Sequence, residues 1–295
     1  MKVGVCCHDA GGAEIVSSYI LHNKLNAIYL LKGPAVKIFE KKLGKINNIS
    51  LDRLSMQADW FICGTSWQSD LEWELVKKAK KLNKKVVSFL DHWVNYKERY
   101  VRNGETVLPD EIWVGDKYAK KIAKDYFQNI KIQLISNPYF LDIKKQLFEL
   151  KNTKKQKGEI DTVLYVCEPI REHAYLQHGD EYYWGYTEEE ALRYFLSNIN
   201  RVCGSNPAIV IRPHPSEDLN KYSFVIEEFN QLNIKISNNR TLLEQILESD
   251  VVVGCESMAM VVALLANKKV ISSIPKGGRA CVLPHKEIES VRNYV

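Results

Sequence analysis

The sequence predicts an α/β protein built from two Rossmann-like domains. Short apolar runs alternate with helical segments along almost the whole chain, and this alternation indicates parallel sheets. The length of 295 residues suits two domains of roughly 100 to 150 residues each. A polar, lysine-rich stretch at residues 151–158 interrupts the alternation. We therefore expect one domain at residues 1–150, a linker, and a second domain at residues 159–295.

The first domain begins with an apolar strand at residues 2–7, followed by His8, Asp9 and a helix. Two glycines, Gly11 and Gly12, are expected to let the backbone turn tightly and to bring the helix N-terminal amides to the edge of the sheet. The third glycine of a dinucleotide-binding fingerprint is absent. The pattern therefore indicates either a nucleotide site or only tight packing of the first strand and helix. Further strands are expected at residues 27–31, 60–63, 85–90, 111–114 and 132–135.

The second domain repeats the alternation after a helix expected at residues 141–150. Thr187 precedes three glutamates at residues 188–190, and a threonine cap followed by acidic residues is typical of a helix start. We interpret these glutamates as capping and dipole devices rather than catalysts. Strands are expected at residues 162–167, 208–212, 234–236, 251–253 and 269–272, and helices at residues 188–200, 220–231, 242–248 and 257–266.

Composition and charge limit the classes of partner. Hydrophobic residues make up 45% of the chain and charged residues 26%, which is ordinary for a soluble protein with a buried core. The net charge of +5 is modest, and no nucleic acid partner is expected. Lysine clusters such as the one at residues 77–85 indicate solvated helix faces or, alternatively, attraction to anionic lipid head groups or phosphate-rich ligands. No apolar run approaches the roughly 20 residues of a membrane helix, so any membrane contact is expected to be peripheral.

The seven cysteines show no paired metal-type spacing, and the chain begins Met-Lys-Val-Gly-Val without a signal peptide. These features predict a reducing, cytoplasmic location. Cys6 and Cys7 are adjacent in a predicted strand, and we interpret them as core thiols. The patterns Asp-x-Asp, His-Glu-x-x-His and Cys-x-x-Cys are absent from the sequence. We therefore expect neither a metal site nor a cofactor, and a mechanism that uses side chains and helix amides.

Two runs in the second domain place polar side chains directly after apolar strands. The first is Arg212-Pro213-His214-Pro215-Ser216-Glu217, and the second ends in Gly254-Cys255-Glu256-Ser257. Open α/β sheets bind phosphorylated ligands at strand ends of this kind. His214, held between two prolines, is expected to donate a hydrogen bond to a phosphate; the alternative is a structural histidine that caps a loop. Arg212 contacts the phosphate or pairs with Glu217 or Asp218.

The second run offers an anion site at the start of a helix. The Ser257 hydroxyl and the amides of Ser257 and Met258 are expected to bind an anion; the alternative is a simple serine cap. Glu256 would repel phosphate if it faced the same way. It is therefore expected to point to a ribose hydroxyl or to solvent.

A third group of polar and aromatic residues follows the strand at residues 162–167. Glu168 closes this strand and precedes Pro169, so it is expected to recognise a base or an acceptor hydroxyl, or to pair with Arg171. The next run, residues 177–186, is rich in aromatic side chains. Such a run stacks on a sugar or nucleobase, or forms a partner interface.

The His-Pro strand end and the later strand-Gly-x-x-Ser-helix, between residues 163 and 275, resemble the donor-binding half of GT-B glycosyltransferases. The resemblance is greatest to bacterial capsule and lipopolysaccharide enzymes with an HP motif, including sialyltransferase-like and CDP-glycerol transferase-like enzymes. It implies two domains that face a cleft, a nucleotide-sugar bound mainly to the second domain, and His214 on the donor phosphate. Many UDP-dependent members carry a ribose-binding glutamate where this sequence reads Met260-Val261-Val262-Ala263. We therefore favour a cytidine donor, as in transferases of sialic-acid-like sugars or of glycerol phosphate, and lean toward a CMP-activated acidic sugar.

The first domain supplies the candidates for a catalytic base. Asp91 and His92 directly follow an apolar strand, and an inverting transferase needs a base that takes the acceptor hydroxyl proton. Asp91, His92 and Asp9 are these candidates; alternatively, Asp91 and His92 only bridge loops. Arg99 is expected to bind an anionic acceptor or to be solvated. Gly11 and Gly12 are placed on the acceptor side.

The sequence as a whole predicts a metal-independent glycosyltransferase. It would move a sugar from a nucleotide-activated donor to a surface-polysaccharide or glycolipid acceptor. One alternative is a UDP-sugar 2-epimerase-like enzyme of the same fold, which would convert UDP-N-acetylhexosamine without an acceptor. Another is a non-catalytic sugar-nucleotide binding protein, which would keep its activity in cells after mutation of Asp91 and His92.

Overall fold

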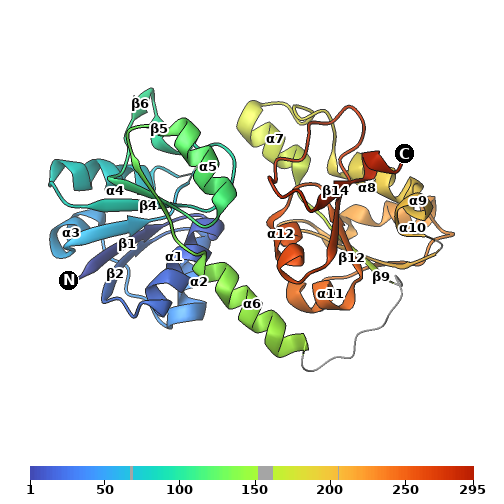
Figure 1. Ribbon diagram of the computed structural model, residues 1–295, viewed down its shortest axis with the longest axis horizontal. Helices are drawn as coiled ribbons and strands as arrows, with labels where there is room; N and C mark the ends of the chain where they lie inside the picture. Colours follow the sequence, from blue (N-terminus) through green and yellow to red (C-terminus); the bar gives the residue numbers. More distant parts are fainter. Residues whose placement is uncertain (67–68, 152–161, 205) are drawn as a thin grey trace. The chain divides into compact units, whose positions relative to one another are not determined.

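The computed structural model describes residues 1–66, 69–151, 162–204 and 206–295. The chain divides into two compact units, Met1–Asp142 (unit 1) and Ile143–Val295 (unit 2). Each unit contains a six-stranded parallel sheet with helices (Figure 1), so the predicted α/β fold class is confirmed. The predicted linker, residues 151–158, lies outside the described residues except for Lys151, which ends helix α6 (Pro138–Lys151).

In unit 1 the strand order is β2-β1-β3-β4-β7-β8. Strand β1 is buried along its whole length, and its side chains enter two cores, Val5 and Cys7 on one face and Cys6 on the other. A parallel strand covered on both faces is apolar on both sides, which explains the run Val-Gly-Val-Cys-Cys and confirms both cysteines as core thiols. The strands of the sheet are β1 (Val3–Cys7), β2 (Ala27–Leu31), β3 (Trp60–Cys63), β4 (Val86–Leu90), β7 (Glu111–Val114) and β8 (Lys131–Leu134).

The remaining elements of unit 1 follow the predicted alternation. Helices lie between most of the strands, and a small antiparallel hairpin of β5 (Val101–Arg102) and β6 (Glu105–Thr106) follows β4. The other helices are α1 (Ala10–His22), α2 (Pro34–Leu43), α3 (Leu51–Gln57), α4 (Leu71–Lys81) and α5 (Lys117–Tyr126).

In unit 2 the strand order is β11-β10-β9-β12-β13-β14. Val163 and Tyr165 of the central strand β9 enter the main core of this unit with Phe195 and Ile211. The strands are β9 (Thr162–Val166), β10 (Ala208–Arg212), β11 (Ile234–Ile236), β12 (Val251–Gly254), β13 (Lys269–Ser272) and β14 (Ile288–Ser290). The helices are α7 (Ile170–His178), α8 (Glu188–Ser197), α9 (Ile199–Cys203), α10 (Phe224–Glu228), α11 (Leu242–Glu248) and α12 (Met258–Leu265).

Several elements of unit 2 differ from the sequence prediction. The helix expected at residues 188–200 is two helices, because Asn198 leaves the helical conformation between them. The helix expected at residues 220–231 shortens to a 3₁₀ turn (Leu219–Tyr222) and α10. The apolar pattern predicts neither β14 nor α7. The ends of α7 are nevertheless marked by Pro169 before it and by left-handed Gly179 after it, as is common for helices.

The strand orders fix where a ligand site belongs in each unit. In unit 1 the chain passes from β1 to β2 on one side and then to β3 on the other, and in unit 2 β9 lies between β10 and β12. Ligands of open α/β sheets bind at the carboxyl ends of strands where the order reverses in this way. A ligand is therefore expected at the loops after β1 and β3 in unit 1, and at the loops after β9 and β12 in unit 2.

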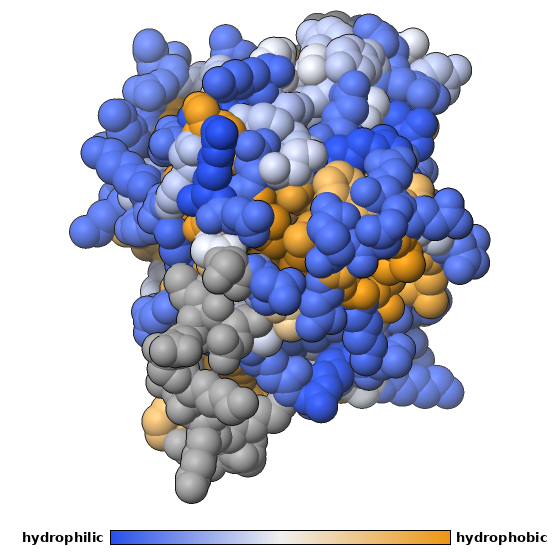
Figure 2. Space-filling model, turned by 90° about the vertical axis from the view of Figure 1, so that its right-hand side faces the viewer, coloured by the Kyte–Doolittle hydropathy of each residue, from blue (hydrophilic) through white to orange (hydrophobic). Residues whose placement is uncertain are grey.

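Most of the surface of unit 2 turned to the viewer in Figure 2 is hydrophilic, with apolar side chains gathered in its middle. The exposed large apolar side chains of this unit include Leu219 and Ile226. Among the described residues, none of the helices has both the length and the hydropathy required to cross a membrane.

Candidate active site

Glu168 lies at the point where the strand order of unit 2 reverses, and its carboxyl group contacts the start of α12. Its Oε1 accepts hydrogen bonds from the amides of Cys255 (3.0 Å) and Glu256 (2.8 Å). Burial, followed by the charge of Glu256, raises the pKa of Glu168 to about 8. The sequence left open a pair between Glu168 and Arg171, but Arg171 pairs with Glu188 and Glu189. The amides before α12 therefore hold a carboxyl group of the same chain.

Ser257 caps α12, since its Oγ accepts a hydrogen bond from the amide of Ala259 at 3.0 Å. Met258 is the first residue of this helix and is partly exposed. Residues 260–263, where many UDP-dependent relatives of the resembled family carry a ribose-binding glutamate, are all buried in the core. In this chain that turn of α12 serves packing, and only its first residues reach the edge of the sheet.

Glu256 faces neither solvent nor an open ligand position, contrary to the expectation from sequence. It is 7% exposed and forms an ion pair with Arg279, whose guanidinium lies 4.0 Å from the ring centre of Trp184. Burial raises the pKa of Glu256, and the adjacent Arg279 charge opposes this shift. The carboxylate is held inside unit 2 because the guanidinium compensates its charge there.

His214 is fixed by its own loop at the end of β10. Its amide donates to Glu217 Oε2 at 3.0 Å, and its Nδ1 accepts a hydrogen bond from the Ser216 amide at 3.3 Å and lies 2.7 Å from Ser216 Oγ. Burial lowers the pKa of His214, and the nearby imidazole of His173 on α7 lowers it further. A neutral imidazole that accepts at Nδ1 carries its proton on Nε2. His214 therefore presents an N–H donor at this strand end.

Arg212 contacts helix α11 and the loop that precedes it. Its Nη1 donates to Gln245 Oε1 at 2.6 Å and to the Arg240 carbonyl at 2.8 Å, so it pairs with neither Glu217 nor Asp218. Glu217 instead accepts from Lys221 (2.6 Å) and Tyr222 (2.9 Å). Arg212 thus stabilises the loop between β11 and α11. His214, two residues further along the chain, remains the hydrogen-bond donor at the end of β10.

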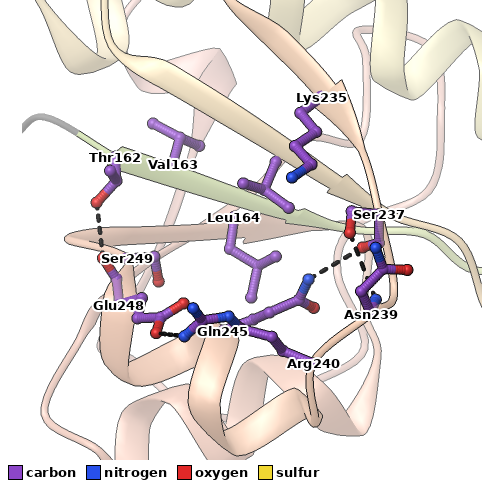
Figure 3. Close-up of a pocket in the computed structure, with 11 residues that line it drawn as sticks. Thr162, Val163, Leu164, Lys235, Ser237, Asn239, Arg240, Gln245, Glu248 and Ser249 are labelled. Carbon is purple, nitrogen blue, oxygen red and sulfur yellow. Dashed lines mark hydrogen bonds and ion pairs between the residues drawn. The ribbon is translucent and has the colours of Figure 1, made fainter.

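Gln245 connects Arg212 to a pocket of about 210 Å³ on the face of the sheet. The pocket lies between β9–β11 and α11, and Leu164 and Lys235 point into it (Figure 3). Gln245 Nε2 also donates to the Ser237 carbonyl at 3.0 Å. Five of the eleven lining residues belong to strands β9, β10 and β11, three follow β11, and three belong to α11 or the residue after it; His214 and Glu168 are not among them. We therefore place the candidate site at the strand ends and not in this pocket.

In unit 1, Asp9 forms the centre of a small polar group where the strand order reverses. Its Oδ1 accepts a hydrogen bond from Ser66 Oγ at 2.8 Å and lies 2.7 Å from His8 Nδ1. A carboxylate bound to one imidazole nitrogen orients the ring. Asp9 and His8 thus form a hydrogen-bonded pair, of which the sequence motif singled out only Asp9.

Asp91 is held by Arg99. Arg99 Nη1 donates to Asp91 Oδ1 at 2.6 Å and to Thr65 Oγ1 at 2.7 Å, and the Arg99 side chain is 6% exposed. The alternative that Arg99 is solvated is wrong, because the guanidinium is buried against Asp91; its binding of an anionic acceptor stays a prediction. His92 follows Asp91 and packs edge-on against Trp93, with ring centres 5.3 Å apart.

Gly11 and Gly12 lie in the first turn of α1, where Asp91 and Gly64 pack closely against them. Neither has a positive φ, so the expected tight turn does not occur at these residues. A side chain at Gly11 would overlap the Asp91 carboxyl, and one at Gly12 would lie 3.0 Å from the Gly64 Cα. Gly12 is buried, and Gly11 admits Asp91 to the first turn of the helix.

Glu72 is a further titratable group at this edge, and the sequence motifs do not predict it. It lies in the first turn of α4, is 4% exposed, and its Oε1 accepts a hydrogen bond from the His8 amide at 2.7 Å. Burial is the main cause that raises the pKa of Glu72 to about 7, and the Asp9 charge adds to the shift. In the sequence Glu72 is indistinguishable from the acidic residues of any first helical turn.

Across the described ranges, no cluster of three or more histidine, cysteine, aspartate or glutamate side chains has the arrangement of a metal site.

Comparison with known proteins supports the fold. No family model matches the chain, and no curated protein matches its sequence. The UDP-GlcNAc 2-epimerase from Neisseria meningitidis has a similar structure, with a TM-score of 0.59, 12% identity, and coverage of 92% of this chain and 82% of the epimerase. The S. aureus MnaA–UDP structure gives a TM-score of 0.59 at 11% identity, over 94% of this chain and 80% of MnaA. The glycosyltransferase of kitacinnamycin gives 0.55 at 9%, over 96% and 82%. The chain therefore has the two-unit α/β fold of GT-B-like enzymes.

Proposed function

We propose that this protein is a glycosyltransferase that uses a nucleotide-activated sugar, with the donor phosphate bound at the strand ends of unit 2. The observation that carries the proposal is the fixed His214 imidazole, whose Nδ1 is engaged by Ser216 and whose Nε2 carries the proton. A positioned N–H donor stabilises the negative charge that develops on a departing nucleotide phosphate. Ser257 and Met258, at the start of α12, are proposed to contribute further donor contacts.

In the proposed reaction the acceptor oxygen attacks the anomeric carbon of the donor. The new bond from carbon to the acceptor oxygen forms while the bond from carbon to the phosphate oxygen breaks, and the configuration at that carbon inverts. The hydroxyl proton passes to a base of unit 1. We favour Asp9 with His8 over Asp91 for this role, because Arg99 donates to Asp91.

The donor we favour is a CMP-activated acidic sugar, and the acceptor a surface polysaccharide or glycolipid. Residues 260–263 offer no glutamate for a ribose, which supports a donor other than a UDP-sugar. We further propose a cytoplasmic location with peripheral contact at the inner face of the membrane. Lysine clusters such as the one at residues 77–85 would favour this contact.

A nucleotide panel tests the donor site. CMP, CDP, UDP, GDP and TDP would each be added to the wild type, to His214→Ala and to His22→Ala, a control histidine of unit 1 that pairs with Asp142. A ligand that binds only the folded state raises the melting temperature. We expect one nucleotide to raise it in the wild type and in His22→Ala but not in His214→Ala. Absence of a shift with all five would contradict the proposal.

A second candidate is a UDP-sugar 2-epimerase-like enzyme. The observation in its favour is the Glu72 carboxyl group, whose pKa of about 7 lies near neutral pH and which is close enough to Asp9 for their charges to interact. Groups that titrate near the working pH suit the removal and return of a carbon-bound proton. Incubation with UDP-N-acetylglucosamine in D₂O, without an acceptor, separates the two candidates. Deuterium at C2 indicates the epimerase, whereas no exchange here, together with transfer from a CMP-activated sugar to a lipid or polysaccharide extract in a separate assay, indicates the transferase.

A further inference from the structure

An exposed aromatic surface lies at the C-terminal end of α7 and in the loop that follows it. Tyr175, Leu176, Tyr182 and Tyr183 are 58%, 59%, 50% and 56% exposed, and the exposed His178 lies between them in the sequence. We call these five residues the aromatic platform. Isolated exposed apolar residues are ordinary, but several close together mark a binding surface.

The platform is held in shape by contacts within unit 2. The rings of His178 and Tyr183 are stacked, with centres 3.6 Å apart and planes at 12°. Asp180 Oδ1 accepts a hydrogen bond from the Tyr182 amide at 2.8 Å, and the Tyr182 hydroxyl donates to Glu190 at 3.0 Å. Left-handed Gly179 ends α7 and joins the helix to the loop. Because the rings of His178, Tyr182 and Tyr183 are already ordered, a ligand would lose little affinity to the ordering of these side chains.

The back of the platform belongs to the candidate donor side. Trp184 and Tyr186 pack in one buried cluster with Ile170 of α7 and with Cys255 and Ile274. Arg279, the partner of Glu256, stacks on Trp184. The exposed rings are therefore connected by packed side chains to the loop between β12 and α12.

The charge of the platform selects among possible ligands. Residues 172–186 contain Glu172, Asp180 and Glu181 and no lysine or arginine, although the chain as a whole carries a net charge of +5. This local negative charge opposes anionic lipid head groups, nucleic acids and free polyphosphates. Aromatic faces and carboxylate oxygens together suit a sugar, because a pyranose has an apolar face that stacks on rings and hydroxyls that donate to carboxylates.

We propose that the aromatic platform is a saccharide-binding subsite that holds an uncharged glycan segment of the acceptor. The term acceptor rests on the proposed transferase function, whereas the binding of a glycan to the platform does not depend on that function. The sequence predicts acceptor binding in unit 1. The proposal assigns part of this recognition to α7 and the following loop of unit 2.

Glycan binding without nucleotide tests the proposal. Chitotetraose and maltotetraose would be titrated into the wild type, Tyr183→Ala and Tyr175→Ala, with saturation-transfer NMR as the readout. The matched control is Ile226→Ala, an exposed apolar residue of the same unit that is 47% exposed and lies outside the platform. Loss of one stacking ring should weaken binding by about tenfold, and the control should bind as the wild type does. Equal melting temperatures would show that the variants are folded.

The outcomes separate the two proposals. If a glycan binds and the platform variants weaken it while the nucleotide panel fails, the platform stands and the transferase proposal falls. If neither glycan binds, or the tyrosine variants bind as the wild type does, the platform proposal is overturned. It is also overturned if the variants instead abolish sedimentation with phosphatidylglycerol vesicles. In an active transferase, Tyr183→Ala should raise the KM for the acceptor about tenfold and leave the KM for the donor unchanged.

Discussion

Helix α1 of unit 1 and helix α12 of unit 2 both begin where the strand order of a sheet reverses, yet different groups meet their first turns. At α12 the Glu168 carboxyl accepts the amides of Cys255 and Glu256. At α1, Asp9 precedes the helix without capping it, and its carboxylate instead contacts Ser66 and His8. Asp9 of unit 1 therefore lies among side-chain partners. In unit 2 the amides before α12 are occupied by the Glu168 carboxyl, so an anion would have to displace it in order to bind them.

The two units also differ in how deeply the arginines of their ion pairs are buried. The Arg99–Asp91 pair of unit 1 is largely buried, with side chains 6% and 12% exposed, whereas Arg171 of unit 2 is 40% exposed beside its glutamates. Removal of one partner from a buried pair leaves an uncompensated charge in a medium of low polarity. Arg171 is the exposed member of its pair, and Glu188, which is 3% exposed, keeps a second cation, Lys221, when Arg171 is removed.

Replacement of these two arginines should give the largest difference between the units. Arg99→Met should lower the free energy of unfolding by about 3 to 5 kcal/mol, because Asp91 stays largely buried without its cation. Arg171→Met should lower it by at most about 1 kcal/mol, since Lys221 still pairs with Glu188. Urea unfolding at pH 7 measures both values. Equal losses in the two variants would show that Asp91 finds another partner or water.

Loss of the two strand-end carboxyl groups should give a smaller difference. Glu168→Ala leaves two amides before α12 without their acceptor, and this should cost about 1 to 3 kcal/mol. Asp9→Ala should cost about 1 kcal/mol or less, because Ser66 and His8 are polar side chains that can turn to other partners. The same urea titration checks both. A larger loss in Asp9→Ala than in Glu168→Ala would reverse our assignment of which unit depends on its strand-end carboxyl.

Local sequence signals predicted part of the site and long-range contacts decided the rest. Thr187 and Glu190 form the expected capping box, since both belong to one helical turn, and the strand-end positions of His214, Asp9 and Asp91 follow from the apolar runs before them. The Glu256–Arg279 pair joins residues 23 positions apart, and Glu72 reaches the His8 amide across 64 positions. Such contacts depend on how loops pack, and no spacing rule in the sequence specifies them. The same holds for Arg99, whose burial follows from contacts with Thr65 and Asp91.

The smallest expected difference between the units lies in the pH dependence of stability, to which each unit contributes through one buried carboxyl group. The pKa of Glu168 is raised from 4.5 to about 8 and that of Glu72 from 4.5 to about 7. Between pH 4.5 and its raised pKa, each of these carboxyl groups is protonated in the folded chain and ionised in the unfolded chain. As far as these groups are concerned, the free energy of unfolding should therefore be highest below about pH 4.5, where both states are protonated. It should fall as the pH rises toward 7 and 8, by less than about 1.4 kcal/mol per pH unit for each group.

Glutamine variants assign this slope to the units, because glutamine keeps the acceptor oxygen and cannot titrate. Urea unfolding at pH 5, 6, 7 and 8 should show a shallower fall in Glu168→Gln over the whole range. In Glu72→Gln the fall should be shallower only up to about pH 7. The exposed Glu40→Gln serves as the control and should follow the wild type. If both buried variants kept the wild-type slope, the two carboxyl groups would be ionised in the folded chain. Glu168 would then present a full negative charge at the start of α12, and a donor phosphate would have to displace it in order to reach those amides.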